Sequence, residues 1–185
     1  MSILNRRSFL ASAGAATTLA ACGNGVGSDG GAVIDARVDS TRDFLFNKYP
    51  ATRELVSKAF GVLYMPLITE AGLGLGGAYG RGALRINDAT VDYYSATKAS
   101  VGLQIGVQQY AHALMFMTPE ALSNFRRSEG WAAGADLKYV VSEDGQTLRA
   151  ETTTVLDPVL AVVFGQAGLL IGATIEGTKY TRIIP

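Results

Sequence analysis

The spacing of hydrophobic residues divides the chain into a helical first part and a longer, strand-rich second part. Between residues 34 and 45 an apolar or small side chain recurs every three or four positions, which predicts a helix with one face toward a core. That face consists of Ile34, Val38, Thr41 and Leu45. Pro50 suits the first turn of a second helix that ends before Gly61. The residues predicted to point inward from it are Leu55, Val56, Ala59 and Phe60.

From residue 62 onward, short apolar segments follow one another and glycine separates many of them. Between residues 100 and 110 apolar residues alternate with glycine or glutamine, and this period of two indicates a strand. Further strands are predicted at residues 62–68, 72–80, 81–86, 91–95, 111–117, 131–141, 147–154, 159–164, 169–175 and 179–184. Asn87-Asp88 and Asp144-Gly145 are predicted to be turns, the latter within a hairpin. Thr118, Pro119 and Glu120 have the order of an N-cap, a first helical residue and a first-turn acid, so a helix is expected from there to Gly130.

These elements predict an α+β fold: a large, mainly antiparallel sheet with a few helices on one side or at one end. The chain has 22 glycines, where average usage gives about thirteen. A strand with glycine at every second position has a bare face, which permits strong curvature or the close approach of a helix or another sheet. We therefore expect a strongly curved sheet or a partial barrel. A bare face also leaves room for a cavity that holds an acyl chain, and the sequence does not decide between these uses.

Two motifs suggest functions that their context disfavours. Residues 72–77 match G-x-G-x-x-G, but a dinucleotide site needs a helix directly after the motif, and Gly80 and Gly82 follow without a helical period. A glycine-faced strand is the better interpretation. Residues 159–175 are almost entirely apolar, as in a membrane helix, but the run is at the short limit for spanning a bilayer. Gly165 to Gly168 sit in its middle like a turn, so a buried hairpin is favoured.

Composition and charge exclude several classes of function. The formal net charge is zero, so nothing suggests the basic surface that nucleic-acid binding requires. His112 is the only histidine and Cys22 the only cysteine, and G-x-S-x-G is absent. We therefore predict no catalytic residues, no metal site and no cofactor, and interpret His112 as structural. Asp35, Asp39 and Asp43 form a stripe that we interpret as a solvated helix face. Tyr93, Tyr94, Tyr110 and Trp131 suit either a membrane interface or lipid site, or ordinary packing.

The first residues resemble a bacterial twin-arginine export signal joined to a lipoprotein cleavage box. Arg6-Arg7-Ser8-Phe9-Leu10 opens a short apolar stretch that ends in Leu19-Ala20-Ala21-Cys22-Gly23. The resemblance implies a signal peptide over residues 1–21 and lipidation of Cys22, and two or more acyl chains anchor a protein firmly. Cleavage would leave 164 of the 185 residues with a formal charge of −2, because the leader holds two arginines and no acid. Residues 22–32 are expected to form the lipidated anchor and a flexible linker, and residues 33–185 a single domain.

A set of short motifs in a fixed order resembles the SYLF domain, a lipid-binding module related to Ysc84-like actin- and phosphoinositide-binding domains. The motifs are Ala59-Phe60-Gly61-Val62-Leu63-Tyr64-Met65-Pro66, the glycine run 72–82, Tyr93-Tyr94-Ser95-Ala96, residues 100–106, residues 164–169 and Glu176-Gly177-Thr178-Lys179. The resemblance spans roughly residues 33–184. Where the family often has Trp-Ser-Ala-Pro, this chain has Tyr94-Ser95-Ala96-Thr97. Its first helix is also less basic than the lipid-contacting version in the family.

The resemblance implies a non-catalytic lipoprotein of the cell envelope that binds phospholipid, of the phosphatidylinositol type in eukaryotic members. Its partners would be the phospholipid membrane and a bound acyl lipid, and its place the periplasmic face of the outer membrane. The candidate headgroup ligands are basic residues of the N-terminal helices: Arg37, Arg42, Lys48, Arg53 and Lys58. Interleaved acids nearly cancel their charge, so a strong pull toward anionic lipid does not follow from charge alone. The alternatives are a structural lipoprotein that docks a protein partner, and an enzyme acting on envelope lipids.

Overall fold

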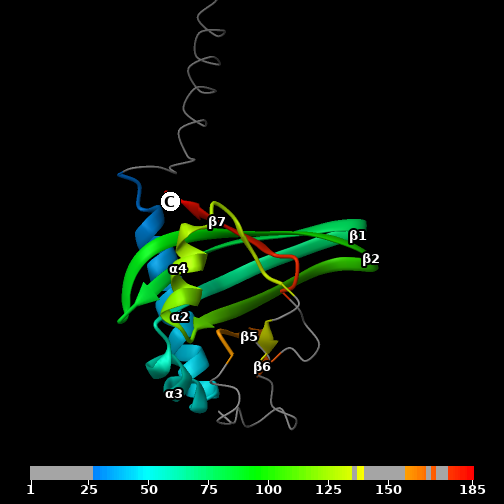
Figure 1. Cartoon of the computed structure of the whole chain (residues 1–185). Helices are drawn as coiled ribbons and strands as arrows, with labels where there is room; N and C mark the ends of the chain where they lie inside the picture. Colours follow the sequence, from blue (N-terminus) through cyan, green and yellow to red (C-terminus); the bar gives the residue numbers. More distant parts are fainter. Residues whose placement is uncertain (1–26, 135–136, 140–156, 166–167, 170–174) are drawn as a thin grey trace, which may run out of the picture.

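The computed structural model describes residues 27–134, 137–139, 157–165, 168–169 and 175–185. This part of the chain forms an α+β fold in which three helices accompany a strongly curled sheet of seven strands, a half-barrel (Figure 1). The helices are α2 (Gly30–Lys48), α3 (Ala51–Lys58) and α4 (Pro119–Arg127). The strands are β1 (Gly61–Ile86), β2 (Ala89–Phe116), β3 (Trp131–Ala132), β4 (Lys138–Tyr139), β5 (Val159–Gly165), β6 (Gly168–Leu169) and β7 (Lys179–Ile183). The predicted fold class is therefore confirmed.

The sheet is built on one very long hairpin of β1 and β2. The two strands pair antiparallel from Gly61 opposite Phe116 to Ile86 opposite Ala89. Asn87 and Asp88 connect them with positive φ angles of 49° and 66°, as the predicted turn requires. Halfway along, near Gly72 opposite Gly106, the register shifts and both strands bend back on themselves. Each strand thus has two arms, and the hairpin extends away from the helices to this bend (Figure 1).

The two arms of β2 pair with different strands. Residues 93–97 pair with β7, which in turn pairs with β3, whereas residues 111–116 pair with β5. β5 also pairs with β6, and its parallel pairing with β4 is the exception in an otherwise antiparallel sheet. The bend therefore converts one hairpin into a half-barrel that encloses an interior.

Glycine lets the two arms of β1 approach each other closely. A Cβ on Gly82 would lie 2.0 Å from the Tyr64 carbonyl oxygen, and one on Gly80 would lie 2.3 Å from that of Leu67. Real Cβ atoms essentially never come closer than 3.0 Å to another heavy atom. The bare strand face expected from the sequence is therefore used for close approach of backbone to backbone.

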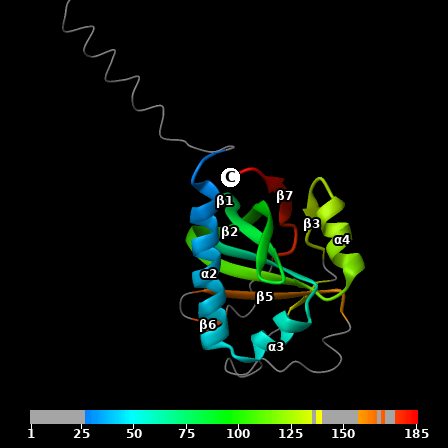
Figure 2. The same ribbon diagram turned by 90° about the vertical axis from the view of Figure 1, so that its left-hand side faces the viewer.

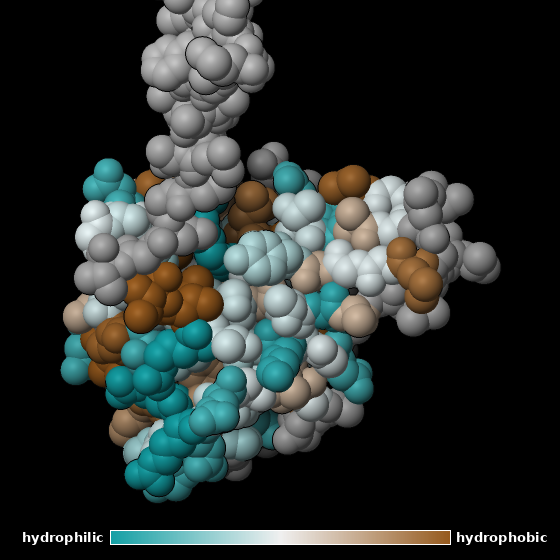
Figure 3. All heavy atoms as spheres, turned by 90° about the horizontal axis from the view of Figure 1, so that it is seen from above, coloured by the Kyte–Doolittle hydropathy of each residue, from teal (hydrophilic) through white to brown (hydrophobic). Residues whose placement is uncertain are grey.

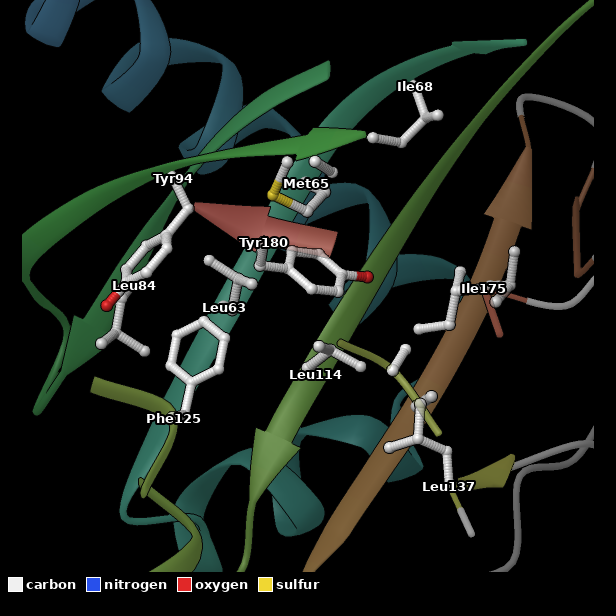
Figure 4. Packing of buried hydrophobic residues seen from close by; sticks show 14 of the residues in the cluster. Leu63, Met65, Ile68, Leu84, Tyr94, Leu114, Phe125, Leu137, Ile175 and Tyr180 are labelled. Carbon is white, nitrogen blue, oxygen red and sulfur yellow. The ribbon is translucent and has the colours of Figure 1, made fainter. Parts of the chain in front are cut away.

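Two apolar cores lie on opposite faces of the sheet. On the outer face α2 crosses the strands (Figure 2) and packs through Val38 and Leu45 against residues such as Tyr64, Ala113 and Val162. The inner core fills the half-barrel, and Figure 4 shows the Tyr180 ring surrounded by side chains from several elements. The residues of that core include Leu63, Met65, Ile68, Leu84, Tyr94, Leu114, Phe116, Phe125, Leu137, Ile175 and Tyr180.

The helices begin largely where their capping residues predict. The Thr118 hydroxyl accepts a hydrogen bond of 3.1 Å from the Ala121 N–H, which confirms it as the N-cap of α4. In α2 the four predicted inward residues are all buried, and the helix begins at Gly30. The inward position of Phe60 is wrong, because α3 ends at Lys58 and the Phe60 side chain is 50% exposed.

The expected strand boundaries need correction in the glycine-rich region. Residues 62–68, 72–80 and 81–86 are one strand, and residues 91–95, 100–110 and 111–117 lie within or beside a second. Glycine bends these strands instead of ending them, and Pro66 is accommodated at a bulge between Met65 and Ile68. Residues 131–141 hold two short strands in their described part, not one. The hairpin predicted around Asp144-Gly145 lies outside the described residues.

The apolar run 159–175 begins as a hairpin. β5 pairs antiparallel with β6 through Phe164 opposite Leu169 and Gly165 opposite Gly168. Residues 160–164 are buried in the sheet, while 170–174 lie outside the described residues. None of the helices in the described ranges combines the length and the apolar character that crossing a membrane needs.

Candidate functional site

Helix α2 has a hollow along each of its two flanks. The first, which we call the groove, has a volume of about 410 Å³ and lies between α2 and the outer sheet face. Its walls are mainly apolar and are formed by Ser40, Thr41, Phe44, Pro66, Leu67, Gln109, Tyr110, Ala111, Phe164 and Gly165. The rings of Phe44 and Phe164 stack at 5.9 Å between centroids, so one wall is continuous from helix to sheet.

Two of the predicted headgroup ligands lie on the groove side of α2. Arg37 is four residues before Thr41, and Lys48 is four residues after Phe44, so each is one turn beyond a groove residue on the same helix face. Both side chains are exposed. Within the described residues neither forms an ion pair. An apolar hollow bracketed by two unneutralised cations has the polarity of a site for an acyl chain with an anionic head.

The second hollow, which we call the arginine pocket, lies between α2, α3 and the β1–β2 turn and has a volume of about 500 Å³. Arg42 and Arg53, both predicted headgroup ligands, line it together with Arg85 of β1. Its other walls come from Asp43, Phe46, Asn47, Val56, Ser57, Ala59, Gly61, Val62, Tyr64, Asn87 and Asp88. Burial in this wall raises the pKa of the Tyr64 hydroxyl to about 12.

The cations of the arginine pocket already have anionic partners. Arg42 donates two hydrogen bonds, of 2.5 and 2.7 Å, to the carboxylate of Asp88. This pairing lowers the pKa of Asp88 and raises that of Arg42. Arg85 has a side chain only 9% exposed and lies 2.7 Å from the carboxylate of Asp39. An incoming phosphate would therefore have to compete with carboxylates that are already in place.

The acidic stripe of α2 is only partly the solvated face expected from the sequence, because Asp43 is 64% exposed whereas Asp35 and Asp39 contact the β1–β2 hairpin. Asp35 accepts hydrogen bonds of 2.8 Å from the hydroxyls of both Thr90 and Tyr93. Asp39 pairs with the buried Arg85. Asp35 and Asp39 therefore fix α2 to the β1–β2 hairpin.

The remaining candidates are placed separately. The Arg53 guanidinium stacks over the Phe46 ring at 5.0 Å. Lys58 pairs with Glu54 at 2.7 Å, and the exposure of both side chains makes this a weak surface interaction. Cys22, the predicted lipidation site, lies outside the described residues. The structure thus brings the five cations to three places: the groove side, the arginine pocket and the outer surface of α3.

Sequence reasoning missed Arg85 and the walls of the groove. One signal for Arg85 was available, because it shares a strand face with the apolar Ala83 and so had to be buried and paired. No local signal could identify the groove. Its walls combine residues as far apart as Ser40 and Gly165, which only the fold brings together.

The aromatic residues left open by the sequence are mostly core residues. Tyr94, Tyr110 and Trp131 all belong to the inner core or pack against it, and Tyr93 packs against the outer one. Tyr110 also forms part of the groove. Core packing therefore accounts for Tyr93, Tyr94 and Trp131 without a membrane interface or a lipid site.

His112 is a structural residue, as predicted. It is fully buried, and its Nε2 shares a hydrogen bond of 2.7 Å with the Tyr180 hydroxyl. Burial lowers the pKa of His112 to about 3, so the ring is neutral at physiological pH. Among the residues described, no three side chains of the kinds that ligate metals gather in one place.

Comparison with models of protein families gives a match in the second half of the chain. No curated protein matches the chain. The matched segment contains the second arm of β2, α4 and the strands from β3 to β7, and all five predicted headgroup ligands lie before it. Residues 97–182 match the family model described as Ysc84, Las17-binding protein actin regulator, which supports the SYLF-like domain that the ordered motifs predict.

Proposed function

We propose that this protein binds phospholipid through the groove beside α2. The observation that carries the proposal is the combination of apolar walls with two exposed cations, Arg37 and Lys48, on the groove side of the bordering helix. A volume of about 410 Å³ is in the range of small-molecule sites. An acyl chain would lie against Phe44 and Phe164, and the phosphate would meet Arg37 or Lys48.

The charges favour the groove over the arginine pocket as the headgroup site. In the arginine pocket a phosphate would bind Arg42 or Arg85 only by displacing the carboxylate that each of them already holds. At the groove a phosphate meets cations with no competing carboxylate among the described residues. Preference for a phosphatidylinositol-type headgroup, as in eukaryotic members of the SYLF family, belongs to this proposal as its narrower form.

The chain is further proposed to be a lipoprotein of the cell envelope, anchored through Cys22 at the periplasmic face of the outer membrane. The leader pattern supports this part of the proposal. Metabolic labelling with an alkyne-bearing fatty acid tests it. The full chain should incorporate label and the Cys22→Ser chain should not, and equal labelling of the two would contradict acylation at this residue.

Liposome flotation of the chain from residue 22 onward, carrying Cys22→Ser, tests phospholipid binding without the anchor. We expect co-flotation with vesicles containing phosphatidylglycerol or phosphatidylinositol. Ser40→Trp should reduce retention of a fluorescent acyl lipid, because Ser40 is exposed at the groove and an indole would fill it. Ser57→Trp is the matched control, since Ser57 is also exposed but lines the arginine pocket.

A charge pair of variants tests the headgroup contact. Arg37→Gln with Lys48→Gln should weaken retention of a fluorescent anionic acyl lipid by about tenfold or more, since a hydrogen bond to a charged group contributes about 1.5–3 kcal/mol. Arg53→Gln with Lys58→Gln removes the same charge from outside the groove and should have a much smaller effect. Absence of co-flotation with every lipid would overturn the proposal and favour the alternative of an anchored protein that docks a protein partner.

A further inference from the structure

The described chain begins and ends on one surface, which we call the terminal face. Ser28, just before α2, donates a hydrogen bond of 2.8 Å to the carbonyl oxygen of Pro185. A Cβ on Gly30 would lie 2.8 Å from the Pro185 carbonyl carbon, so the first turn of α2 rests directly on the C-terminus. Figures 1 and 2 both show the C-terminus beside the start of α2.

Three apolar side chains around this junction are exposed to solvent: Ile184 at 69%, Val33 at 50% and Val91 at 40%. They come from the end of the chain, the first turn of α2 and the first residues of β2. Figure 3 looks down on this side of the molecule and shows a patch of hydrophobic side chains bordered by hydrophilic ones. Exposed apolar side chains around such a junction are a feature of interaction surfaces.

Three arginines lie beside the apolar residues. Arg126 and Arg182 approach the same carboxylate, that of Asp92, at 2.9 and 3.5 Å. Asp92 is only 13% exposed, whereas the two arginine side chains are 41% and 51% exposed. One carboxylate cannot neutralise both guanidinium groups, and Arg127, in the last turn of α4, is a third exposed cation.

These guanidinium groups suit lipid phosphate in particular. Arginine donates to phosphate oxygens in a bidentate manner and bears its charge at every physiological pH. Asp29 directly precedes α2, and Glu129 follows Arg127 by two residues. Together with Asp92, these acids offset the charge of the three arginines, so the net charge of the region is small. Docking would therefore depend on direct contact with phosphate and on burial of the apolar trio, not on long-range attraction.

The position of the predicted anchor fits this face. Gly30, the first residue of α2, follows Cys22 by eight residues. Even fully extended, eight residues span at most about 28 Å. If Cys22 carries acyl chains in a bilayer, the terminal face cannot be farther from the membrane than that distance.

We propose that the terminal face is the surface that docks onto the phospholipid bilayer, with Val33, Val91 and Ile184 at the acyl boundary and Arg126, Arg127 and Arg182 on lipid phosphates. This inference rests on the proposed phospholipid binding and adds the orientation of the domain. The groove then opens on the side of the docked molecule, farther along α2 from the bilayer surface.

Site-specific fluorescence tests the orientation. Because Cys22 is the only cysteine, the Cys22→Ser chain is a cysteine-free background. Ile184→Cys, labelled with an environment-sensitive fluorophore, should shift to the blue with phosphatidylglycerol–phosphatidylethanolamine vesicles and be quenched by a spin-labelled lipid. The controls are Leu75→Cys, 76% exposed near the strand bend, and Ser57→Cys on α3, which should show neither change.

Removing charge gives a second, independent readout. Arg127→Gln with Arg182→Gln leaves Arg126 to pair with Asp92, so the fold retains its buried carboxylate contact. The same vesicles should bind this variant about 30-fold more weakly, whereas Arg53→Gln with Lys58→Gln should bind within a few-fold of the parent chain.

The two proposals fail in different ways. If the parent chain does not float with any vesicle, phospholipid binding is overturned and the docking face with it. If the parent chain floats but the label at residue 75 or 57 is quenched and that at residue 184 is not, phospholipid binding stands and the terminal face is refuted. Unchanged binding by the Arg127 and Arg182 variant would likewise remove the arginines from the docking contact.

Discussion

Gly82→Ala should destabilise the protein because it places a methyl group between the two arms of β1. The added Cβ would lie 2.0 Å from the Tyr64 carbonyl oxygen and 2.5 Å from the Met65 sulfur. An ordinary contact begins at 3.4 Å, so the arms would have to separate by about 1.4 Å. Tyr64 and Met65 are almost fully buried, and Tyr64 packs under α2 while Met65 lies inside the half-barrel. The displacement therefore disturbs both cores.

The expected magnitude follows from two opposing effects. Replacing glycine by alanine in a regular element otherwise stabilises it by about 0.5–1 kcal/mol, because glycine loses more conformational freedom on folding. Overpacking of a close-packed core costs about 1–3 kcal/mol, and the clash here is with backbone, which cannot rotate away. With the cost near the upper end of that range, we expect Gly82→Ala to lower the free energy of unfolding by about 2 kcal/mol.

Urea denaturation followed by circular dichroism measures this free energy, and Gly130→Ala is the matched control. A Cβ on Gly130 would lie 2.2 Å from the Lys179 side chain, but that is the flexible end of an exposed lysine and can move. Gly130→Ala should therefore stay within about 0.5 kcal/mol of the parent. A Gly82→Ala chain as stable as the parent would refute the reasoning that glycine permits the folded-over sheet.

Three further predictions concern charge and pH. Because burial lowers the pKa of His112 to about 3, the unfolded chain binds a proton that the folded one does not, and stability should fall by about 2 kcal/mol between pH 7 and pH 5. Urea midpoints at the two pH values check this, and His112→Gln should remove most of the slope. Asp39→Asn should lower the free energy of unfolding by about 1–3 kcal/mol, because Arg85 is buried and loses its closest partner. The control is Asp43→Asn, at an exposed carboxylate, which should change this free energy by less than about 0.5 kcal/mol. Urea titrations of the two variants compare them. The lowered pKa of Asp88 contributes stability that is present above pH about 4 and lost as pH falls through the folded pKa, so Arg42→Gln should flatten acid titrations of stability in that range.

Local chemistry in the sequence was sufficient for the turns and helix starts. The Asn87-Asp88 turn and the Thr118 N-cap need only neighbouring residues, and both are found as predicted. The lengths of β1 and β2 could not be predicted from neighbouring residues in the same way. A glycine in a strand pattern indicates a loop, a bulge or a close contact, and which of these applies depends on what lies opposite. For Gly80 and Gly82 the opposing atoms are carbonyls of the same strand, at Leu67 and Tyr64.

The ion pairs of α2 also depend on residues that are distant in sequence, so the sequence alone could not predict them. Along the helix, arginines and aspartates nearly cancel, and a count of charges treats all of them alike. In the structure Arg42 is paired with Asp88 of the distant turn, and Asp39 is paired with Arg85 of β1. Arg37 and Lys48 have no ion-pair partner among the described residues, although they are ordinary members of the same pattern. The sequence could name the cations of the candidate site but could not separate the paired from the unpaired.

The walls of the groove come partly from the segment that matches the Ysc84 family model and partly from residues before it. Most of its sheet wall, from Gln109 to Ala111 with Phe164 and Gly165, lies within the residues that match the Ysc84 family model, whereas Pro66 and Leu67 of β1 lie before them. Its helix wall, with Phe44 and the flanking Arg37 and Lys48, lies before the matched segment. The sheet wall supplies mainly the apolar surface and the helix supplies the charge. We therefore expect the sheet to determine that an acyl chain is bound and α2 to determine which headgroup accompanies it, so that exchanging residues 30–48 for a more basic helix should change headgroup preference in vesicle flotation while acyl-lipid retention persists.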